Sequence, residues 1–535
     1  MRQRLRPVLL ALALTLVVGA FRFLSLSGFN NDHYVHFAAA QQIAMGEWPS
    51  RDYVELGLPL MELLSAVPFW LFRDAPLFGE ALLVAMMFAL AAVFTLYAAR
   101  RLTASWWIAL LVVALEVVIF PRTYSYPKVL AYAAGLLAMW RYVDRPSLSR
   151  MLQLAIAVVV AFGLRYDHGI YVGIGGLLTV VAVSMPLGRV ETLSKAASFA
   201  GIVLLLVMPY VVYLQVHEGF WQHIVRGIDL QAVESSRGRT IPAFTFDNGL
   251  LVSNAVPWLF FVFHLLPVAA AIAVWVCWRQ QGWRERAAVV PLIVVALLAN
   301  FGLIRDTVSA RLPDAVVPVS MLLGWLVAVT LRLRPSPARS LTWIAAATVV
   351  VFTMASATAV GATKEQLEKA EMLGSPVRLW GHVHSRIAQL HERFPASQMP
   401  SRVVARLVPF LHYVDRCLGP RDHILIPGFA PEVAVWSRRP FAGGQIWFQP
   451  ELLSSDEDHR LVMSRLQVQR VPVAVLLLPS SDALAASFPE LGRYLRDHFP
   501  EMTPLEGDED ERVTIAFDPQ IAVGRDHDTG WYCYR

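Results

Sequence analysis

The chain has few cysteines and few charged residues for its length. Only 3 of its 535 residues are cysteine, and none stands in a CxxC or metal-like spacing. Neither a disulfide framework nor a zinc site is therefore indicated. Charged residues make up 16% of the chain, and the net charge of +5 is spread among short loops. A nucleic-acid-binding protein is expected to have a clustered basic face, so we expect no nucleic-acid partner.

Internal repeats, low-complexity tracts and glycine-rich phosphate-binding loops are absent as well. Apolar sequence fills the chain in their place, since 56% of the residues are hydrophobic and the mean hydropathy is +0.50. A soluble globular protein is markedly less apolar than this. The composition therefore predicts an integral membrane protein.

About eleven segments are apolar and long enough to cross a bilayer core of about 30 Å, which takes about 17–25 helical residues. Arginine and lysine clusters precede the first segment and follow the second, fourth, sixth, eighth and tenth. With a cytoplasmic amino terminus, all of these clusters lie on the cytoplasmic side, as the positive-inside rule requires. A cleaved signal peptide is the alternative for the first segment, because Val18-Gly19-Ala20 resembles a cleavage site. The predicted spans are residues 7–25, 76–99, 104–121, 127–143, 150–165, 169–186, 197–216, 250–278, 287–304, 315–331 and 341–361.

The composition of the sequence divides the chain into an apolar membrane part, residues 1–361, and a polar terminal part, residues 362–535. The first outer loop, residues 26–75, is predicted to hold two surface helices, at 33–45 and 58–72. The second of these is apolar but only about fifteen residues long, which suits an interfacial helix better than a span. The predicted fold class is a polytopic α-helical membrane protein with a C-terminal extracytoplasmic α/β domain.

The terminal part shows helical and strand patterns in alternation. Cys417 and Cys533 both lie in it, and an oxidising compartment would allow them to pair. The sequence leaves open whether they do. The predicted elements are surface helices within 364–394, strands at 423–426, 471–478 and 513–517, and helices at 456–466 and 484–499.

Asp32 is the first acid beyond the first predicted span, and it stands where a helix is expected to begin. One reading is a helix cap, whose side-chain oxygen accepts bonds from free backbone N–H groups. A second reading is a general base, because a helix start keeps a carboxylate ionised. Asp52 lies in the same loop.

A second polar group stands at the predicted outer end of the fifth span, where Arg165, Asp167 and His168 follow one another closely. Such residues at a helix end are costly unless they face a polar cavity or each other. A functional site and an interfacial salt-bridge cluster are the two interpretations.

Four basic residues lie in two of the predicted outer loops, against the positive-inside bias. Arginine and lysine at headgroup depth bind lipid phosphate, and arginine does so with two parallel hydrogen bonds. Contact with ordinary anionic headgroups, or pairing with Asp306 and Asp314, is the alternative. The four residues are Arg122, Lys128, Arg305 and Arg311.

These features together resemble a known family. Asp32 leads into a helix with Tyr34 and Ala39, followed by Gly46, Arg51-Asp52-Tyr53 and Gly57-Leu58-Pro59-Leu60. The pattern resembles the first outer loop of GT-C superfamily glycosyltransferases that use polyprenyl-phosphate sugars, such as protein O-mannosyltransferases and aminoarabinose transferases. The stretch from Arg165 to Gly169 resembles a motif of bacterial members.

The resemblance implies a glycosyltransferase of the bacterial inner (plasma) membrane that moves a sugar from a polyprenyl-phosphate donor to an acceptor hydroxyl, with inversion. Asp32 would be the catalytic base, although Asn31 stands where many relatives have a second acid. Asp167 substitutes for an acid that relatives place in the second outer loop. Arg305, Arg311, Lys128 and Arg122 would bind the donor phosphate. Supporting or acceptor-binding roles are predicted for Asp52, His33, His36, Tyr34, Arg165 and His168.

No metal ligands are assigned from the sequence and no cofactor is expected, although a divalent metal stays open. The expected partners are the donor, membrane lipids and a glycan, lipid or protein acceptor. An oligosaccharide polymerase or ligase is the alternative enzyme, and a polytopic transporter is the alternative from another class. The sequence leaves open the sugar, the acceptor and the oligomeric state.

Overall fold

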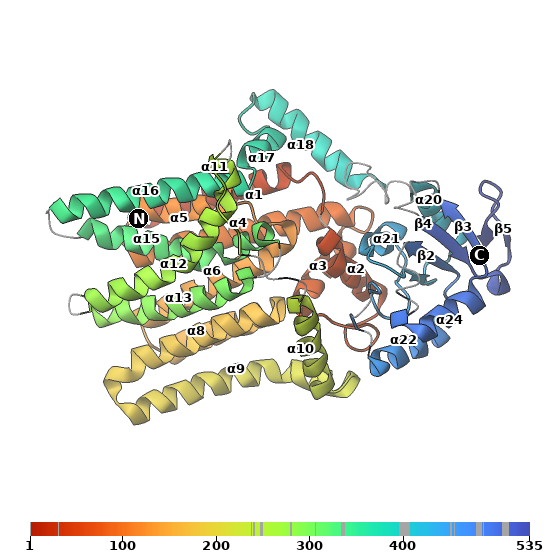
Figure 1. Cartoon of the computed structure of the whole chain (residues 1–535), viewed down its shortest axis with the longest axis horizontal. Coiled ribbons are helices and arrows are strands. Elements are labelled where there is room, and N and C mark those ends of the chain that lie inside the picture. Colours follow the sequence, from red (N-terminus) through yellow and green to blue (C-terminus); the bar gives the residue numbers. More distant parts are fainter. Residues whose placement is uncertain are drawn as a thin grey trace. The chain divides into compact units, whose positions relative to one another are not determined.

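The computed structural model describes residues 2–535 except positions 30, 237, 239–240, 247–249, 279–280, 305–306, 333–336, 395–406, 450–451, 454, 478–483, 485 and 506–512. Its contacts divide the chain into two compact units that are interleaved in sequence (Figure 1). The first unit comprises Met1–Leu26, Ala81–Val211 and Ser235–His382, and the second comprises Ser27–Glu80, Val212–Glu234 and Val383–Arg535. The predicted domain boundary at residue 361 is a different division of the chain and stays a prediction.

A helix lies at each of the eleven predicted spans, which confirms the helical membrane architecture. Eight helices among the described residues are long and apolar enough to cross a membrane. The predicted spans 104–121, 127–143 and 150–165 form helices outside that set. The helices are α1 (Arg2–Leu24), α4 (Pro76–Thr103), α5 (Trp106–Val118), α6 (Tyr126–Asp144), α7 (Leu148–Leu164), α8 (Tyr166–Ser184), α9 (Arg189–His217), α12 (Ala255–Val276), α13 (Trp283–Phe301), α15 (Val316–Arg332) and α16 (Pro337–Val360).

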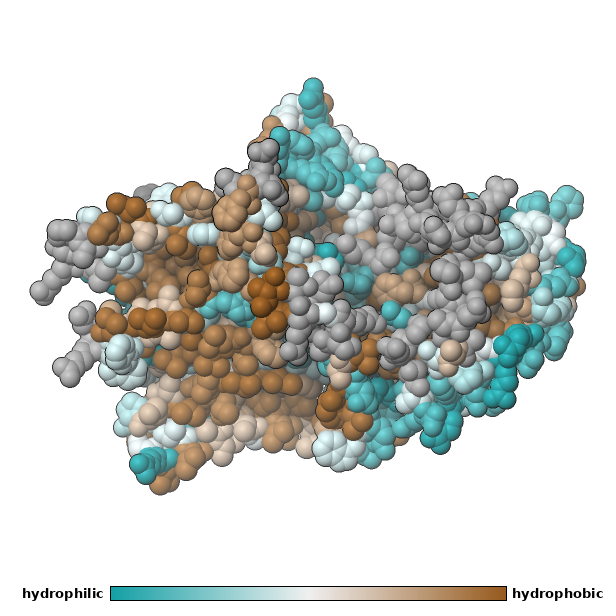
Figure 2. Space-filling model, viewed as in Figure 1, coloured by the Kyte–Doolittle hydropathy of each residue, from teal (hydrophilic) through white to brown (hydrophobic). Residues whose placement is uncertain are grey.

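Helices α6, α7 and α8 of the first unit pack against one another, and α13 packs against α8. Gly175 permits this last approach, because a Cβ there would lie 2.4 Å from Val295 Cγ2. Large apolar side chains such as Leu204 and Leu205 on α9 stay exposed. Figure 2 shows hydrophobic surface over much of the helical part of the molecule, as expected of helices that face lipid. Four further helices begin in this unit: α11 (Leu250–Ser253), α14 (Val308–Arg311), α17 (Thr363–Ala370) and α18 (Pro376–His391).

The second unit combines helices with a four-stranded sheet of order β1-β2-β4-β3. Strands β1 and β2 are parallel, whereas β4 is antiparallel to β2 and β3. Three predicted strands are confirmed, and β3 was not predicted. The elements are α2 (Asn31–Met45), α3 (Pro59–Leu71), α10 (Phe220–Ser236), α20 (Val408–Cys417), β1 (Ile424–Leu425), α21 (Pro431–Ser437), α22 (Asp456–Val468), β2 (Val473–Leu477), α24 (Pro489–His498), β3 (Glu501–Leu505), β4 (Val513–Phe517), β5 (Gly524–Arg525) and β6 (Tyr532–Cys533).

Within this unit, helix α2 packs against α21 of the polar terminal part. Gln41 Nε2 donates to Ala434 O at 2.9 Å and to Arg439 O at 3.0 Å. These two bonds join α2 to α21 and to the residue Arg439 that follows it closely. Cys417 and Cys533 form a disulfide, which settles the pairing that the sequence left open and fastens α20 to β6.

Candidate functional site

Asp32 lies in the first turn of α2, and its side chain is exposed. The helix begins at Asn31, so Asp32 stands inside the first turn rather than before it. Acidic side chains are stabilising in the first turn of a helix, where backbone N–H groups lack intrahelical partners. The residues that follow, such as Phe37 and Ala38, are buried and fix the orientation of the helix. Asp32 is therefore a rigidly placed, accessible carboxylate.

The turn after α2 is held by Asp52. Its Oδ2 atom accepts a bond from Trp48 N at 2.7 Å and one from Arg51 Nε at 2.8 Å. Tyr213 OH donates to Pro49 O at 2.6 Å in the same turn. These contacts give Asp52 a structural role, and its predicted part in acceptor binding stays a prediction.

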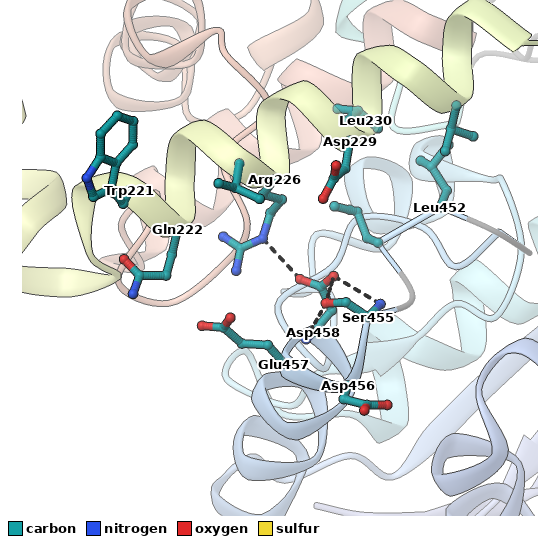
Figure 3. Close-up of a pocket in the computed structure, with 13 residues that line it drawn as sticks. Trp221, Gln222, Arg226, Asp229, Leu230, Leu452, Ser455, Asp456, Glu457 and Asp458 are labelled. Atoms are coloured by element: carbon teal, nitrogen blue, oxygen red, sulfur yellow. Dashed lines mark hydrogen bonds and ion pairs between the residues drawn. The ribbon is translucent and has the colours of Figure 1, made fainter.

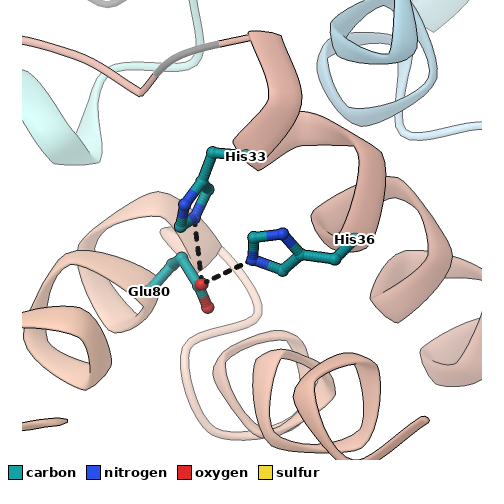
Figure 4. A group of neighbouring side chains, drawn as sticks. All are labelled: His33, His36 and Glu80. Carbon is teal, nitrogen blue, oxygen red and sulfur yellow. Dashed lines mark hydrogen bonds and ion pairs between the residues drawn. The ribbon is translucent and has the colours of Figure 1, made fainter. Parts of the chain in front are cut away.

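His33, His36 and Tyr34 lie on the same helix as Asp32, and all three are buried. The two imidazoles point toward the carboxylate of Glu80, near the start of α4 (Figure 4). We call His33, His36 and Glu80 the His–Glu cluster. The burial of the three predicted residues is consistent with support of α2, and their proposed functional roles stay predictions. Glu80 is not predicted as a site residue, because it lies 47 residues from His33 inside a predicted span.

A paired-charge cluster in the first unit brings together four predicted site residues and one acid named only as an alternative partner. Lys128 Nζ at the start of α6 donates to Asp314 Oδ2. Arg165 Nε donates to Asp167 Oδ1 at 2.9 Å across the junction of α7 and α8. His168 Nδ1 lies 2.6 Å from Tyr132 OH. We define this cluster as Lys128, Asp314, Arg165, Asp167 and His168.

Both acids of the paired-charge cluster have a basic partner, so the salt bridges considered as an alternative are present. The two pairs differ in exposure. The side chains of Lys128 and Asp314 are 5% and 12% exposed, whereas those of Arg165 and Asp167 are 27% and 35% exposed. The Arg165–Asp167 pair is therefore the more exposed part of the cluster.

The other three predicted phosphate ligands are Arg311, Arg122 and Arg305, which are not among the residues that define the paired-charge cluster. Arg311 ends the short helix α14, three residues before Asp314. Arg122 is exposed, and its guanidinium donates to Tyr124 OH at 3.0 Å. Arg305 lies outside the described residues. Their predicted role in phosphate binding stays a prediction.

An open pocket of about 570 Å³ lies between α10 and the start of α22 in the second unit (Figure 3). Arg226 on α10 donates through Nε to Asp458 Oδ1 at 3.0 Å. The exposed indole of Trp221 and the side chains of Asp229 and Glu457 also line the pocket. No site residue is predicted on α10 from the sequence, although the polar residues of this helix recur at helical spacing.

His223, on the same helix, links two acids. Its Nδ1 atom is bonded to Glu218 Oε1, and its Nε2 atom lies 3.7 Å from Glu55 Oε2. Burial lowers the pKa of His223, but the bond to Glu218 and the charges of both acids outweigh this effect. As a result, the pKa of His223 is raised above 6.5, the usual value of a histidine.

No family model matches the chain, and no curated protein matches it in sequence. The structure is similar to that of ArnT from Cupriavidus metallidurans bound to undecaprenyl phosphate, with a TM-score of 0.53 and 16% identity over 95% of this chain and 97% of that chain. The same protein in the apo state gives a TM-score of 0.48 at 14% identity, over 95% and 97% of the two chains. The Archaeoglobus fulgidus oligosaccharyltransferase in the apo form gives 0.45 at 13% identity, over 91% of this chain and 72% of that chain. The first of these similarities carries the assignment of the fold: the chain has the fold of ArnT, in agreement with the resemblance of its first loop to GT-C enzymes.

Proposed function

We propose that the protein is a membrane glycosyltransferase that moves a sugar from a polyprenyl-phosphate donor to an acceptor hydroxyl on the outer side of the membrane. The observation that carries the proposal is the similarity to ArnT over 95% of the chain, because that protein is bound to undecaprenyl phosphate. The exposed acid Asp32 at a helix start supports it, because transfer of a sugar to a hydroxyl group needs a base that removes the hydroxyl proton.

Asp32 is proposed to remove the proton from the acceptor hydroxyl. The hydroxyl oxygen then forms a bond to the anomeric carbon of the sugar, while the bond from that carbon to the phosphate oxygen breaks. Attack from the face opposite the leaving group inverts the anomeric centre. The step needs no nucleotide, since the polyprenyl phosphate is itself the leaving group.

The paired-charge cluster is proposed to bind the donor phosphate. Negative charge builds up on the phosphate as it leaves, and fixed positive groups stabilise that charge. Arg165 is the more exposed of the two cations, so it is proposed to contact the phosphate, while Lys128 acts through its charge. Arg122, Arg305 and Arg311 are proposed as further phosphate contacts. Asp167 orients Arg165 in this account.

The amino terminus is proposed to lie in the cytoplasm and the polar terminal segment outside it. The distribution of arginine and lysine supports this orientation. The disulfide between Cys417 and Cys533 supports it independently, because such bonds persist in oxidising compartments. The pocket between α10 and α22 is the proposed place for the acceptor, since it offers carboxylates and an exposed indole.

The test uses purified protein in nanodiscs with a panel of radiolabelled polyprenyl-phosphate sugars. We expect Asp32→Asn to lower turnover by about 100-fold or more, the usual effect of losing a general base. Asp497→Asn is the matched control, because Asp497 is an exposed acid on α24 that takes no part in the proposed reaction. Its turnover should equal that of the wild type.

Turnover that survives Asp32→Asn would reduce Asp32 to a residue that stabilises the start of α2. Folded protein that neither binds nor turns over any donor would overturn the proposal and favour a transporter. Transfer of preassembled glycans instead of single sugars would favour a polymerase or ligase.

A further inference from the structure

The His–Glu cluster is buried without enough partners for its polar atoms. The side chains of His33, His36 and Glu80 are 0%, 1% and 0% exposed. His36 Nε2 and Glu80 Oε2 have no hydrogen-bond partner among the described residues. Burying a carboxylate and an imidazole with unmet bonding capacity is unfavourable unless something compensates the charge.

The surroundings of the cluster are aromatic. The ring of His33 stacks on Phe29 with 4.3 Å between the centroids, and Phe37 packs against Phe69 with 4.6 Å between theirs. Ser65 is the polar neighbour on α3, and its Oγ donates to Glu80 Oε1 at 2.9 Å. An apolar shell of this kind strengthens the interaction of the three side chains with any cation between them.

We propose that His33, His36 and Glu80 bind one divalent cation of the zinc class through the two Nε2 atoms and the Glu80 carboxylate. Imidazole and carboxylate are ligands that Zn²⁺ accepts, and two histidines with one acid hold the ion where a non-protein ligand such as water fills the fourth position. The two histidines lie three residues apart on α2, so they project from the same face of the helix. Both rings point at Glu80 in Figure 4.

The distances fit such an ion. Zinc binds nitrogen and carboxylate oxygen at about 2.0–2.2 Å, so two ligand atoms of a tetrahedral ion lie about 3.4 Å apart. His33 Nε2 and His36 Nε2 lie 3.0 and 3.6 Å from Glu80 Oε1, and the three ligand atoms all lie within 4.8 Å of one another. The Ser65 hydroxyl holds the carboxylate in place, as the outer partners of metal ligands usually do.

The ion has a structural role in this account. The cluster is closed to solvent, so no substrate reaches it, and the ion joins α2 to the start of α4. It therefore fixes the helix turn that presents Asp32. The proposal does not depend on glycosyl transfer and would stand if that function were wrong.

The experiment measures metal content on the full chain, purified in detergent without chelators. We expect about one equivalent of zinc per chain in the wild type and substoichiometric metal in His36→Gln and Glu80→Gln. His223→Gln is the control, because His223 is also a buried histidine between carboxylates but lies outside the cluster. It should keep the wild-type metal content.

A second measurement uses only the wild-type protein, so it tests the proposal even if the variants do not fold. The wild type is stripped of metal and titrated with Co²⁺, whose absorption reports a tetrahedral nitrogen and oxygen site. Saturation at one equivalent, reversed by excess Zn²⁺, supports the proposal. A proton shared by the two histidines and Glu80 is the competing explanation, and it predicts no bound metal and no Co²⁺ spectrum. Either that result or full metal retention in His36→Gln would overturn the proposal.

Discussion

Replacing Lys128 by methionine leaves a buried acid without its partner. Lys128 and Asp314 are bonded to each other with side chains only 5% and 12% exposed, so water does little to compensate either charge. Removing one member of a buried ion pair costs about 3–5 kcal/mol. Methionine keeps the unbranched apolar part of lysine, so lost packing adds little. We expect Lys128→Met to lower the free energy of unfolding by about 3–5 kcal/mol for this reason.

The double variant Lys128→Met/Asp314→Leu separates the two roles that Lys128 has in this account. It buries no unpaired charge, so its stability should return to within about 1 kcal/mol of the wild type. Donor turnover should stay low, because the positive charge near the phosphate is still absent. Stability is measured by denaturant unfolding in detergent, followed by circular dichroism, and turnover is measured in nanodiscs.

Two outcomes would refute this reasoning. A single variant as stable as the wild type would show that the Lys128–Asp314 bond does not compensate a buried charge. Recovery of turnover in the double variant would show that the pair is purely structural, and donor binding would then rest on Arg165 and the other arginines.

Two further predictions concern the second unit. Replacing Cys417 and Cys533 by alanine should cost up to about 5 kcal/mol, because the bond closes a loop across a separation of 116 residues; a Tm unchanged from the wild type, with the wild-type disulfide verified by mass spectrometry, would contradict this. The raised pKa of His223 means that its bonds to Glu218 and Glu55 contribute fully below about pH 6.5 and are lost as the pH rises through the higher pKa of the folded state. The Tm difference between wild type and His223→Gln should therefore shrink from pH 6 to pH 9, and a difference that grows over this range would show the opposite sign of shift.

The helices of the first unit could be predicted because a helix that crosses a membrane needs a continuous apolar segment, and such a segment can be recognised in the sequence without knowledge of the fold. The start of α2 could be predicted to within two residues, since an acid such as Asp32 is favoured at the beginning of a helix. Strand β3 could not, because Pro504 and its mostly exposed neighbours lack the apolar alternation of a buried strand. Such a sequence is tolerated at the edge of a sheet, where β3 pairs on one side only.

In the candidate site, too, contacts between residues close in sequence could be predicted, whereas contacts made by helix packing could not. Arg165, Asp167 and His168 are neighbours in sequence, so their cluster could be predicted. Glu80 could not be assigned to His33 and His36, because their contact depends on how α2 packs against the start of α4. The identity of Asp314 as the partner of Lys128 likewise depends on helix packing across 186 residues.

The measurement that tests the central claim most directly is the release of polyprenyl phosphate by the wild-type protein in nanodiscs, with matched polyprenyl-monophosphate and polyprenyl-diphosphate sugars as donors. We predict one polyprenyl phosphate released for each sugar transferred from the monophosphate donor, and no turnover of the diphosphate donor. Turnover of the diphosphate donor alone, or of neither donor by folded protein, would contradict the account.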